Sequence, residues 1–345
     1  MTTRMRAEIG EQPAAVSATL EALLPLAGEI ERLGAGARHV LFIARGSSDN
    51  AAVYGQYLCS VRAGRLATLA SPSIATAYQA HVDLDGVLAV AVSQSGRTEE
   101  IVATQEWARA CGARTVAVTN ADGSPLAEQA DLALLTRAGD ELAVPATKTF
   151  TTQLAALAVL GLALAGDRAG LERLREVPAA IEQALDAAEA AEALAVRLTY
   201  VQRLVVSARG YAYAIARELA LKLEEACYVT ALGLSYADLE HGPIAVVDAA
   251  TPALLLAAAH DYAMLGAMTE LARRCRAEGA HVYGVGGDDG FAAACDAMLP
   301  APGLPAELAP LTLVVPGQLL TEALARAKGI DPDIPRALAK VTQTT

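Results

Sequence analysis

Short apolar runs alternate with longer amphipathic segments along most of the chain, and this alternation restricts the fold more than any other feature. In the first half, strands are expected at His39–Ala44, Arg65–Leu69, Val87–Val92, Arg114–Val118 and Asp131–Leu135. Helical segments lie between them, for instance Asn50–Arg62 and Glu99–Cys111. Strands that alternate with helices form βαβ units, so the pattern predicts an open parallel sheet with helices on both faces.

The same pattern returns in the second half of the chain. Strands are expected there at Arg203–Ser207, Ala253–Ala257, His281–Gly284 and Leu311–Val315. An Arg-Gly pair closes the first strand of each half, Arg45-Gly46 in one and Arg209-Gly210 in the other. The repeat predicts two tandem open α/β domains of flavodoxin-like type.

These patterns suggest boundaries for the parts of the chain. We expect an N-terminal helical segment at 1–34, a first domain at 35–170, an Ala/Glu-rich helical linker at 171–198, a second domain at 199–328 and a C-terminal tail at 329–345. The tail is predicted to lie over the active site.

The apolar run Val87–Val92 leads directly into Ser93-Gln94-Ser95-Gly96-Arg97-Thr98, and a helical segment follows. A strand that ends in small polar residues and opens a helix presents free N–H groups and partial positive charge to one point, which suits a phosphate. In open parallel sheets, ligands bind beyond the carboxyl ends of the strands. The alternative is that Ser95 or Thr98 simply caps the helix. The second half has no counterpart of this loop, so one phosphate site per chain is expected.

The charge balance limits the partners of this chain. Asp and Glu total 39 against 27 Lys and Arg, for a formal net charge of −12. Nucleic-acid binding normally needs a basic patch, so a nucleic-acid partner is not expected. A small phosphorylated ligand stays possible, because a local pocket of amides and one or two lysines can overcome the overall field.

Cysteine usage and hydropathy indicate a cytoplasmic protein. The five cysteines are scattered without CxxC spacing, which predicts neither a disulfide framework nor a zinc site. The N-terminus shows no signal-peptide pattern. The longest uncharged apolar run, Leu154–Gly166, has 13 residues and is too short to span a bilayer.

A second group of residues could carry proton chemistry. Lys222 and Glu225 lie three positions apart in a helical segment and share one face. His241 precedes Gly242-Pro243, which places its imidazole in a turn. Near one phosphosugar, these groups would supply a proton carrier and a ring-opening acid or base. Taken singly, they could equally be a solvated helix pair and a turn residue.

Seven motifs occur in order along the chain: Glu8–Pro13, Ala44–Ser48, Ser93–Thr98, Val144–Gln153, Ala220–Glu225, His241–Pro243 and Asp333–Lys340. With them the chain resembles the two-domain sugar isomerase (SIS) family of phosphosugar proteins. It is similar to the isomerase half of glucosamine-6-phosphate synthase and to the SIS-type glucosamine-6-phosphate deaminases.

The resemblance implies a sugar-binding set. The phosphate would be held by Ser93, Gln94, Ser95 and Thr98, with Ser48 near the sugar. Val144 lies where a backbone carbonyl of the family touches the sugar hydroxyls. Ala146 stands where the synthase carries a sugar-contacting serine, so contacts to the sugar are expected to differ here.

The resemblance also implies catalytic roles. Glu225 would move the proton between C1 and C2, with Lys222 beside it. His241 would assist ring opening in the neighbouring subunit's site, which implies a homodimer. Lys340 matches the tail lysine that forms a Schiff base with the open-chain ketose, and a lysine amine that attacks a carbonyl is a known form of covalent catalysis. The alternative for Lys340 is a solvated tail residue, which would fray unless a ligand held it.

No cysteine nucleophile follows Met1, so we expect no glutamine-hydrolysing half. The predicted reaction converts glucosamine 6-phosphate and water to fructose 6-phosphate and ammonia, without a metal or organic cofactor. A ketose–aldose phosphosugar isomerase or a fructosamine-phosphate deglycase is the nearest alternative. A non-catalytic phosphosugar sensor is a further one, although the residues before Pro13 are too few for a helix-turn-helix unit.

Overall fold

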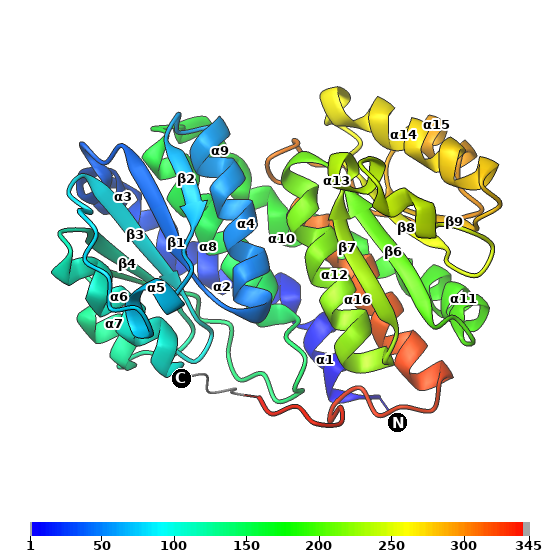
Figure 1. Cartoon of the computed structure of the whole chain (residues 1–345), viewed down its shortest axis with the longest axis horizontal. Helices are drawn as coiled ribbons and strands as arrows, with labels where there is room; N and C mark the ends of the chain where they lie inside the picture. The colour runs from blue at the N-terminus through cyan, green and yellow to red at the C-terminus, as the bar shows by residue number, and fades with distance from the viewer. Residues whose placement is uncertain (1, 341–345) are drawn as a thin grey trace. The chain divides into compact units, whose positions relative to one another are not determined.

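The computed structural model describes residues 2–340, and the chain divides into two compact units (Figure 1). Within the described residues, the first unit comprises 14–141, 148–176 and 339–340. The second unit comprises 2–13, 142–147 and 177–338. Each unit contains one five-stranded sheet. The last five residues of the predicted tail, 341–345, lie outside the described residues.

The sheet of the first unit has the strand order β2-β1-β3-β4-β5, and every neighbouring pair is parallel. Its strands are β1 (His39–Ile43), β2 (Leu66–Leu69), β3 (Val87–Val92), β4 (Arg114–Thr119) and β5 (Leu132–Leu135). The five strands predicted for this half are confirmed, with ends that differ by one residue at most. β3 is buried along almost its whole length, as expected for a continuous apolar run in the middle of a parallel sheet.

Helices cover both faces of this sheet. Ile43, Ala89 and Ala91 pack with Ile101 of α6 in one apolar cluster. Phe42 points to the other face, because side chains alternate along a strand, and it lies directly against α4. The helical elements are α2 (Gln12–Leu23), η1 (Leu24–Leu26), α3 (Ala27–Gly34), α4 (Gly46–Val61), α5 (Ser73–Thr76), α6 (Glu99–Ala110), α7 (Pro125–Gln129), α8 (Lys148–Leu164), α9 (Arg168–Arg173) and η2 (Leu174–Glu176).

The sheet of the second unit has the order β10-β9-β8-β6-β7, again with parallel pairs. Its strands are β6 (Arg203–Ala208), β7 (Thr230–Ser235), β8 (Ala253–Ala257), β9 (Val282–Gly286) and β10 (Ala297–Leu299). Numbered within each repeat, both sheets follow the order 2-1-3-4-5. This is the flavodoxin-like topology predicted from the sequence.

The predicted strand at Leu311–Val315 is wrong, because these residues belong to α16 (Pro310–Ala327). This helix is buried on all sides, so its sequence lacks the polar stripe that marks a surface helix and a short window of it looks like a buried strand. The other helical elements of this unit are α1 (Arg4–Gly10), α10 (Val177–Ala184), η3 (Leu185–Ala187), α11 (Ala188–Leu198), η4 (Gly210–Ala212), α12 (Tyr213–Cys227), α13 (Tyr236–Glu240), η5 (Pro243–Val246), α14 (Tyr262–Ala277) and α15 (Asp289–Ala293).

Two strands of the second sheet were not predicted. β7 contains Gly233, where a Cβ would lie 2.9 Å from the backbone of Arg217, so the glycine lets α12 approach the strand closely. β10 has only three residues. A glycine-interrupted strand and a very short one both give weak periodicity.

The Arg-Gly repeat has the same geometry in both units. Arg45 has φ −142° and ψ 156°, and Arg209 has φ −135° and ψ 154°. The glycines that follow have φ +57° at Gly46 and +64° at Gly210, a left-handed conformation that glycine adopts without strain. The short sequence repeat therefore marks a structural repeat at the end of the first strand of each unit.

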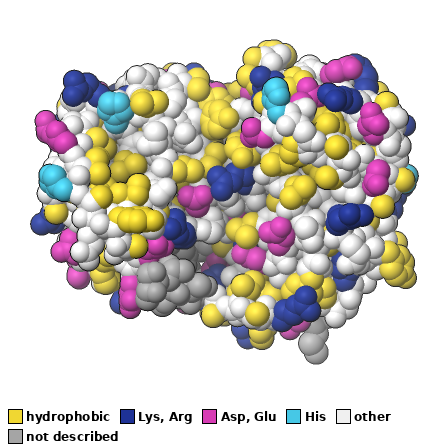
Figure 2. Space-filling view, in the orientation of Figure 1, with side chains coloured by type: hydrophobic (Ala, Val, Ile, Leu, Met, Phe, Trp, Pro, Cys, Tyr) yellow, Lys and Arg dark blue, Asp and Glu magenta, His cyan; other side chains and the backbone are white. Residues whose placement is uncertain are grey.

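In the described part of the chain, no helix combines the length and apolarity that crossing a membrane requires. On the face shown in Figure 2, Lys and Arg side chains are interspersed with Asp and Glu side chains. The five cysteines are free thiols, as expected. Burial raises the pKa of Cys59 and Cys227 to about 12, so neither thiol is suited to act as a nucleophile at neutral pH.

Candidate functional site

The predicted phosphate loop follows β3 in the first unit. Backbone hydrogen bonds join it to the end of β4, with the Ser93 N–H donating to the Val118 carbonyl (3.0 Å) and the Asn120 N–H donating to the Gln94 carbonyl (3.1 Å). Gly96 turns the loop at φ +60°, and a Cβ there would lie 2.2 Å from the Ser124 hydroxyl oxygen. The loop therefore has a fixed path that requires glycine at its turn.

The hydroxyls of this loop do not cap α6 in the simple way that the alternative assumed. Thr98 is the N-cap residue, but its side chain makes no capping hydrogen bond. The Ser95 hydroxyl instead accepts a hydrogen bond from the Arg97 N–H (3.3 Å) inside the loop. The helix N-terminus is thus formed without a hydroxyl cap, which suits an external anion.

Two helix N-termini meet at this edge of the sheet. β1 and β3 are paired neighbours, with Ile43 opposite Ala91, and α4 and α6 begin just beyond them. Strand order reverses between β1 and β3, which is where ligands bind in doubly wound sheets. Arg45, the N-cap residue of α4, also makes no side-chain capping bond. The positive ends of two long helices therefore lie at this edge of the sheet.

Ser48 lies in the first turn of α4 and is buried. Its hydroxyl accepts a hydrogen bond from the Gln153 side-chain amide of α8 (3.0 Å). Arg45 pairs with the buried Glu100 at the start of α6 through two contacts of 2.9 and 3.1 Å. This pair compensates the buried carboxylate and joins the starts of α4 and α6.

The second unit brings Lys222 and Glu225 together on α12. The Lys222 side chain is 1% exposed and its ammonium bonds to the Glu225 carboxylate, whose side chain is 22% exposed. Glu218, completely buried one turn earlier, lies 3.7 Å from the same ammonium. A lysine so deeply buried needs compensating charge, so this group is not a solvated helix pair.

Glu225 lines a pocket of about 570 Å³ in the second unit. Tyr228 and Arg336 form part of its wall, where the guanidinium stacks 4.1 Å from the centre of the tyrosine ring. Glu224 lies in the same wall, and burial, reinforced by the nearby Glu225 charge, raises the pKa of its carboxyl. The pocket therefore presents two carboxyl groups in different electrostatic settings.

His241 lies at the other end of β7. Glu225 precedes the strand near the C-terminus of α12, whereas His241 follows it at the end of α13. Six residues of strand span about 17 Å. The His241 side chain is exposed at a turn where the following residue, Gly242, has φ +127°. The structure does not bring His241 and Glu225 of one chain together.

The segment that carries Val144 and Ala146 is held within the second unit from two sides. The Glu8 carboxylate accepts hydrogen bonds from the Leu142 and Ala143 N–H groups. The Val144 N–H donates to the Asp333 carbonyl (3.0 Å). The motifs Glu8–Pro13 and Asp333–Lys340, near the two ends of the chain, thus hold the segment of the half-buried Val144 and Ala146.

Lys340 is paired in the first unit. Its ammonium lies 2.6 Å from the Glu141 carboxylate, which is completely buried, and its own side chain is 26% exposed. The tail lysine is therefore not a freely solvated residue in this structure.

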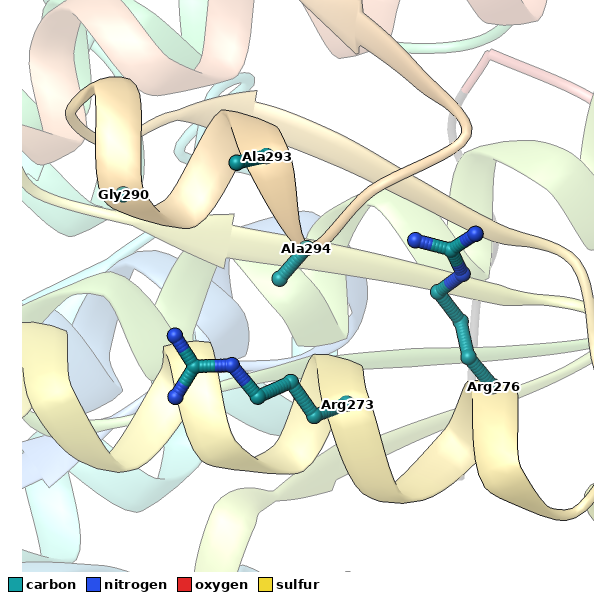
Figure 3. Close-up of a pocket in the computed structure, with 5 residues that line it drawn as sticks. All are labelled: Arg273, Arg276, Gly290, Ala293 and Ala294. Atoms are coloured by element: carbon teal, nitrogen blue, oxygen red, sulfur yellow. The ribbon is translucent and has the colours of Figure 1, made fainter.

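A second hollow of the second unit, of about 230 Å³, lies between α14 and α15 and is lined by Arg273 and Arg276 (Figure 3). It contains none of the predicted site residues. Arg273 is paired with Glu270 and Arg276 with Asp296. Within residues 2–340 no group of three or more His, Cys, Asp or Glu side chains could hold a metal ion.

Four residues at these sites were not predicted from the sequence: Glu8, Glu141, Gln153 and Glu218. Glu218 could have been found, because it lies one helical turn before Lys222. Glu8 and Gln153 belong to two of the seven motifs, but no role was predicted for them, because their partners are distant in sequence. Glu141 lies outside the motifs, and of its contacts only the one with Thr149 is local.

Two flavodoxin-like repeats, the first with two helix N-termini where its strand order reverses and the second with a buried lysine between carboxylates, define a two-repeat α/β protein. The SIS domain model matches residues 35–163 and 197–325, so the chain belongs to the SIS domain family.

Relatives cover nearly the whole chain. It is 33% identical over 343 residues to the glutamine–fructose-6-phosphate aminotransferase [isomerizing] of Pyrococcus horikoshii, which covers 97% of this chain and 57% of that relative. The chain thus spans little more than half the length of that protein. The C-terminal domain of glucosamine-fructose-6-phosphate aminotransferase from Francisella tularensis has a TM-score of 0.89 at 28% identity, covering 97% of this chain and 99% of that one.

A glucosamine-6-phosphate deaminase from Thermotoga maritima has the same fold, with a TM-score of 0.82 at 24% identity over 99% of this chain and 100% of that chain. At this identity the likeness concerns the fold alone.

Proposed function

We propose that this chain is a phosphosugar enzyme of the isomerase type that converts glucosamine 6-phosphate and water to fructose 6-phosphate and ammonia. The observation that carries the proposal is the Lys222–Glu225 pair, a buried ammonium against a partly exposed carboxylate that lines a pocket. A carboxylate held in this way is suited to remove and return a proton. Membership of the SIS family supports the phosphosugar as substrate.

The proposed steps follow from the two repeats. The N-termini of α4 and α6 hold the phosphate, with the Ser93–Thr98 loop and Ser48 around it. After ring opening, the Glu225 carboxylate takes the proton from C2 and returns it to C1, while Lys222 stabilises the charged carboxylate. The aldehyde oxygen gains a proton as the C2 amine nitrogen loses one, so C1 becomes an alcohol carbon and C2 becomes an imine. Water then replaces the imine nitrogen, which leaves as ammonia.

Ring opening by His241 requires a second subunit in this proposal. His241 and Glu225 of one chain lie at opposite ends of β7. We infer that a homodimer places the His241 of one subunit at the Glu225 of its neighbour. In such a two-fold assembly each site receives the same contribution from the partner.

A second candidate function rests on Ala146. This half-buried alanine offers a methyl group where the synthase has a sugar-contacting serine. Loss of that hydroxyl favours a substrate with a different group at this position, as in a ketose–aldose isomerase or a deglycase for an amino-acid–sugar phosphate conjugate.

The proposed cytoplasmic location stays a prediction.

The test is a panel assay with the purified chain. Ammonia and ketose are measured with glucosamine 6-phosphate, other amino-sugar phosphates and a fructosamine 6-phosphate conjugate. We expect equal amounts of ammonia and fructose 6-phosphate from glucosamine 6-phosphate. Turnover of the conjugate alone would favour the deglycase, and binding without turnover of any of them would favour the sensor.

A further inference from the structure

Gln153 is a buried glutamine of α8 whose side-chain amide is only half satisfied. The amide nitrogen donates to the Ser48 hydroxyl (3.0 Å), a contact between α8 and α4 within the first unit. The amide oxygen is buried and has no hydrogen-bond partner among the described residues. An unpaired buried oxygen is unfavourable, and a methionine would fill the same space without it. The amide at this position is therefore explained by its bond to Ser48.

This bond decides what the Ser48 hydroxyl can do. A serine hydroxyl has one proton and two acceptor lone pairs, whereas an amide NH₂ group only donates. Gln153 therefore occupies a lone pair of Ser48 and leaves the proton for another acceptor. Within residues 2–340 no group accepts that proton, although the Ser48 side chain is buried.

Buried hydroxyls elsewhere in the helices of this chain use their protons differently. Four of them donate to the carbonyl four residues earlier in the same helix, at 2.6–3.0 Å: Thr19, Thr104, Thr269 and Thr321. Ser48 makes no such bond, because α4 begins at Gly46 and the residue four positions back, Ala44, precedes the helix. Ser48 is thus a buried hydroxyl with a proton to donate.

The position of Ser48 on α4 indicates what the proton serves. Side chains on a helix tilt toward its N-terminus, so the Ser48 hydroxyl leans toward the start of α4. The first backbone N–H groups there have no intrahelical partner and carry partial positive charge. The hydroxyl proton and these N–H groups together suit an oxyanion.

We propose that Gln153 is a positioning residue that holds the Ser48 hydroxyl as a hydrogen-bond donor to the phosphate group of a sugar phosphate at the start of α4. Gln153 is buried beneath Ser48 and acts through it, without touching the ligand. The inference rests on the proposed function for the identity of the ligand.

Gln153→Met in the full chain tests the proposal, because it fills the space without the amide. Titration calorimetry measures the dissociation constant of fructose 6-phosphate, and the ammonia assay measures kcat with glucosamine 6-phosphate. We expect about tenfold weaker binding, the loss typical of one hydrogen bond to a charged group. The kcat should stay within about threefold, because the proton transfer is assigned to Glu225 in the other repeat.

A double-variant cycle with Ser48→Ala separates positioning from a structural role. Ser48→Ala alone should also weaken binding about tenfold. In its presence Gln153→Met should have no further effect, because no hydroxyl is left to orient. A combined loss of about a hundredfold would mean that Gln153 acts independently of Ser48, against the proposal.

Gln105→Met is the matched control in the same unit. Gln105 of α6 is also a buried glutamine, its amide nitrogen donates to the Leu126 carbonyl (3.0 Å), and its amide oxygen is likewise unpaired. This variant should bind fructose 6-phosphate like the wild type. Urea unfolding shows whether each variant is folded, and Gln153→Leu, with the same expected loss, replaces a methionine variant that does not fold.

Wild-type affinity in a folded Gln153→Met or Gln153→Leu chain would overturn the inference and leave the proposed function standing. A wild-type chain that binds no fructose 6-phosphate would overturn both.

Discussion

The two repeats of this chain share one topology but differ at corresponding positions. In the first, the helix after the opening strand begins directly at the strand's end and carries Ser48 in its first turn. In the second, the corresponding helix α12 begins after a 3₁₀ turn and carries Lys222 and Glu225 near its C-terminus. The proposed function assigns anion binding to one copy and proton chemistry to the other, so that residues, and not topology, would set the function.

The largest effect on stability is expected from Lys222→Met, which removes the ammonium that lies between Glu218 and Glu225. Glu218 would then be a buried carboxylate without its cation, and such losses destabilise proteins by about 3–5 kcal/mol. The free energy of unfolding, measured with urea, should fall by this amount.

The control is Lys328→Met, a part-buried lysine of the same unit that donates to the Val201 carbonyl. We expect this variant to lose about 1 kcal/mol. Similar losses in the two variants would contradict the view that Lys222 balances buried charge.

A mixing experiment tests whether the second repeat works across two chains. Glu225→Gln and His241→Ala should each retain little turnover, below about one hundredth for loss of a general acid or base. In a shared dimer, random exchange of subunits should restore about a quarter of wild-type turnover, because half the dimers are mixed and each has one complete site. No recovery on mixing would contradict a site shared between two subunits.

Gly96→Ala should weaken phosphosugar binding by the first repeat and leave the proton transfer proposed for the second repeat unchanged. The left-handed backbone at Gly96, and the contact with Ser124, predict a distorted loop and an affinity for fructose 6-phosphate at least about tenfold lower. Titration calorimetry measures this affinity.

Gly36→Ala is the control variant, because Gly36 also has a left-handed backbone (φ +79°) but a Cβ there would contact no other atom. Both variants should lose about 1–2 kcal/mol of stability from backbone strain. Normal affinity in Gly96→Ala would show that this loop does not hold the phosphate.

The smallest expected effect is on the free energy of unfolding at acidic pH. Because the pKa of Glu141 is lowered in the folded chain, its contribution to stability is full above the unfolded value of about 4.3 and is lost as pH falls through the folded value. The difference in free energy of unfolding between wild type and Glu141→Gln should therefore be constant above pH ~5 and shrink below pH ~4. A difference that grows on acidification would contradict the assigned ion pair.

Sequence patterns predicted the first sheet well because its central strands are continuous apolar runs followed by long amphipathic helices. They failed at Leu311–Val315, where a completely buried helix has no polar face. The loop at Ser93 and the α12 residues were visible locally. The roles of Glu8 and Gln153 were not, although both belong to the seven motifs, because each acts through a contact more than a hundred residues away.

The division of labour between the repeats is tested most directly by Glu225→Gln, with Glu224→Gln as the neighbouring control in the same pocket wall. Turnover of glucosamine 6-phosphate and the dissociation constant of fructose 6-phosphate are measured on both variants. We predict that Glu225→Gln lowers kcat by about 10²–10⁴ while the dissociation constant stays within about threefold, and that Glu224→Gln changes neither strongly. Equal loss of binding and turnover in Glu225→Gln, or unchanged turnover, would contradict the account.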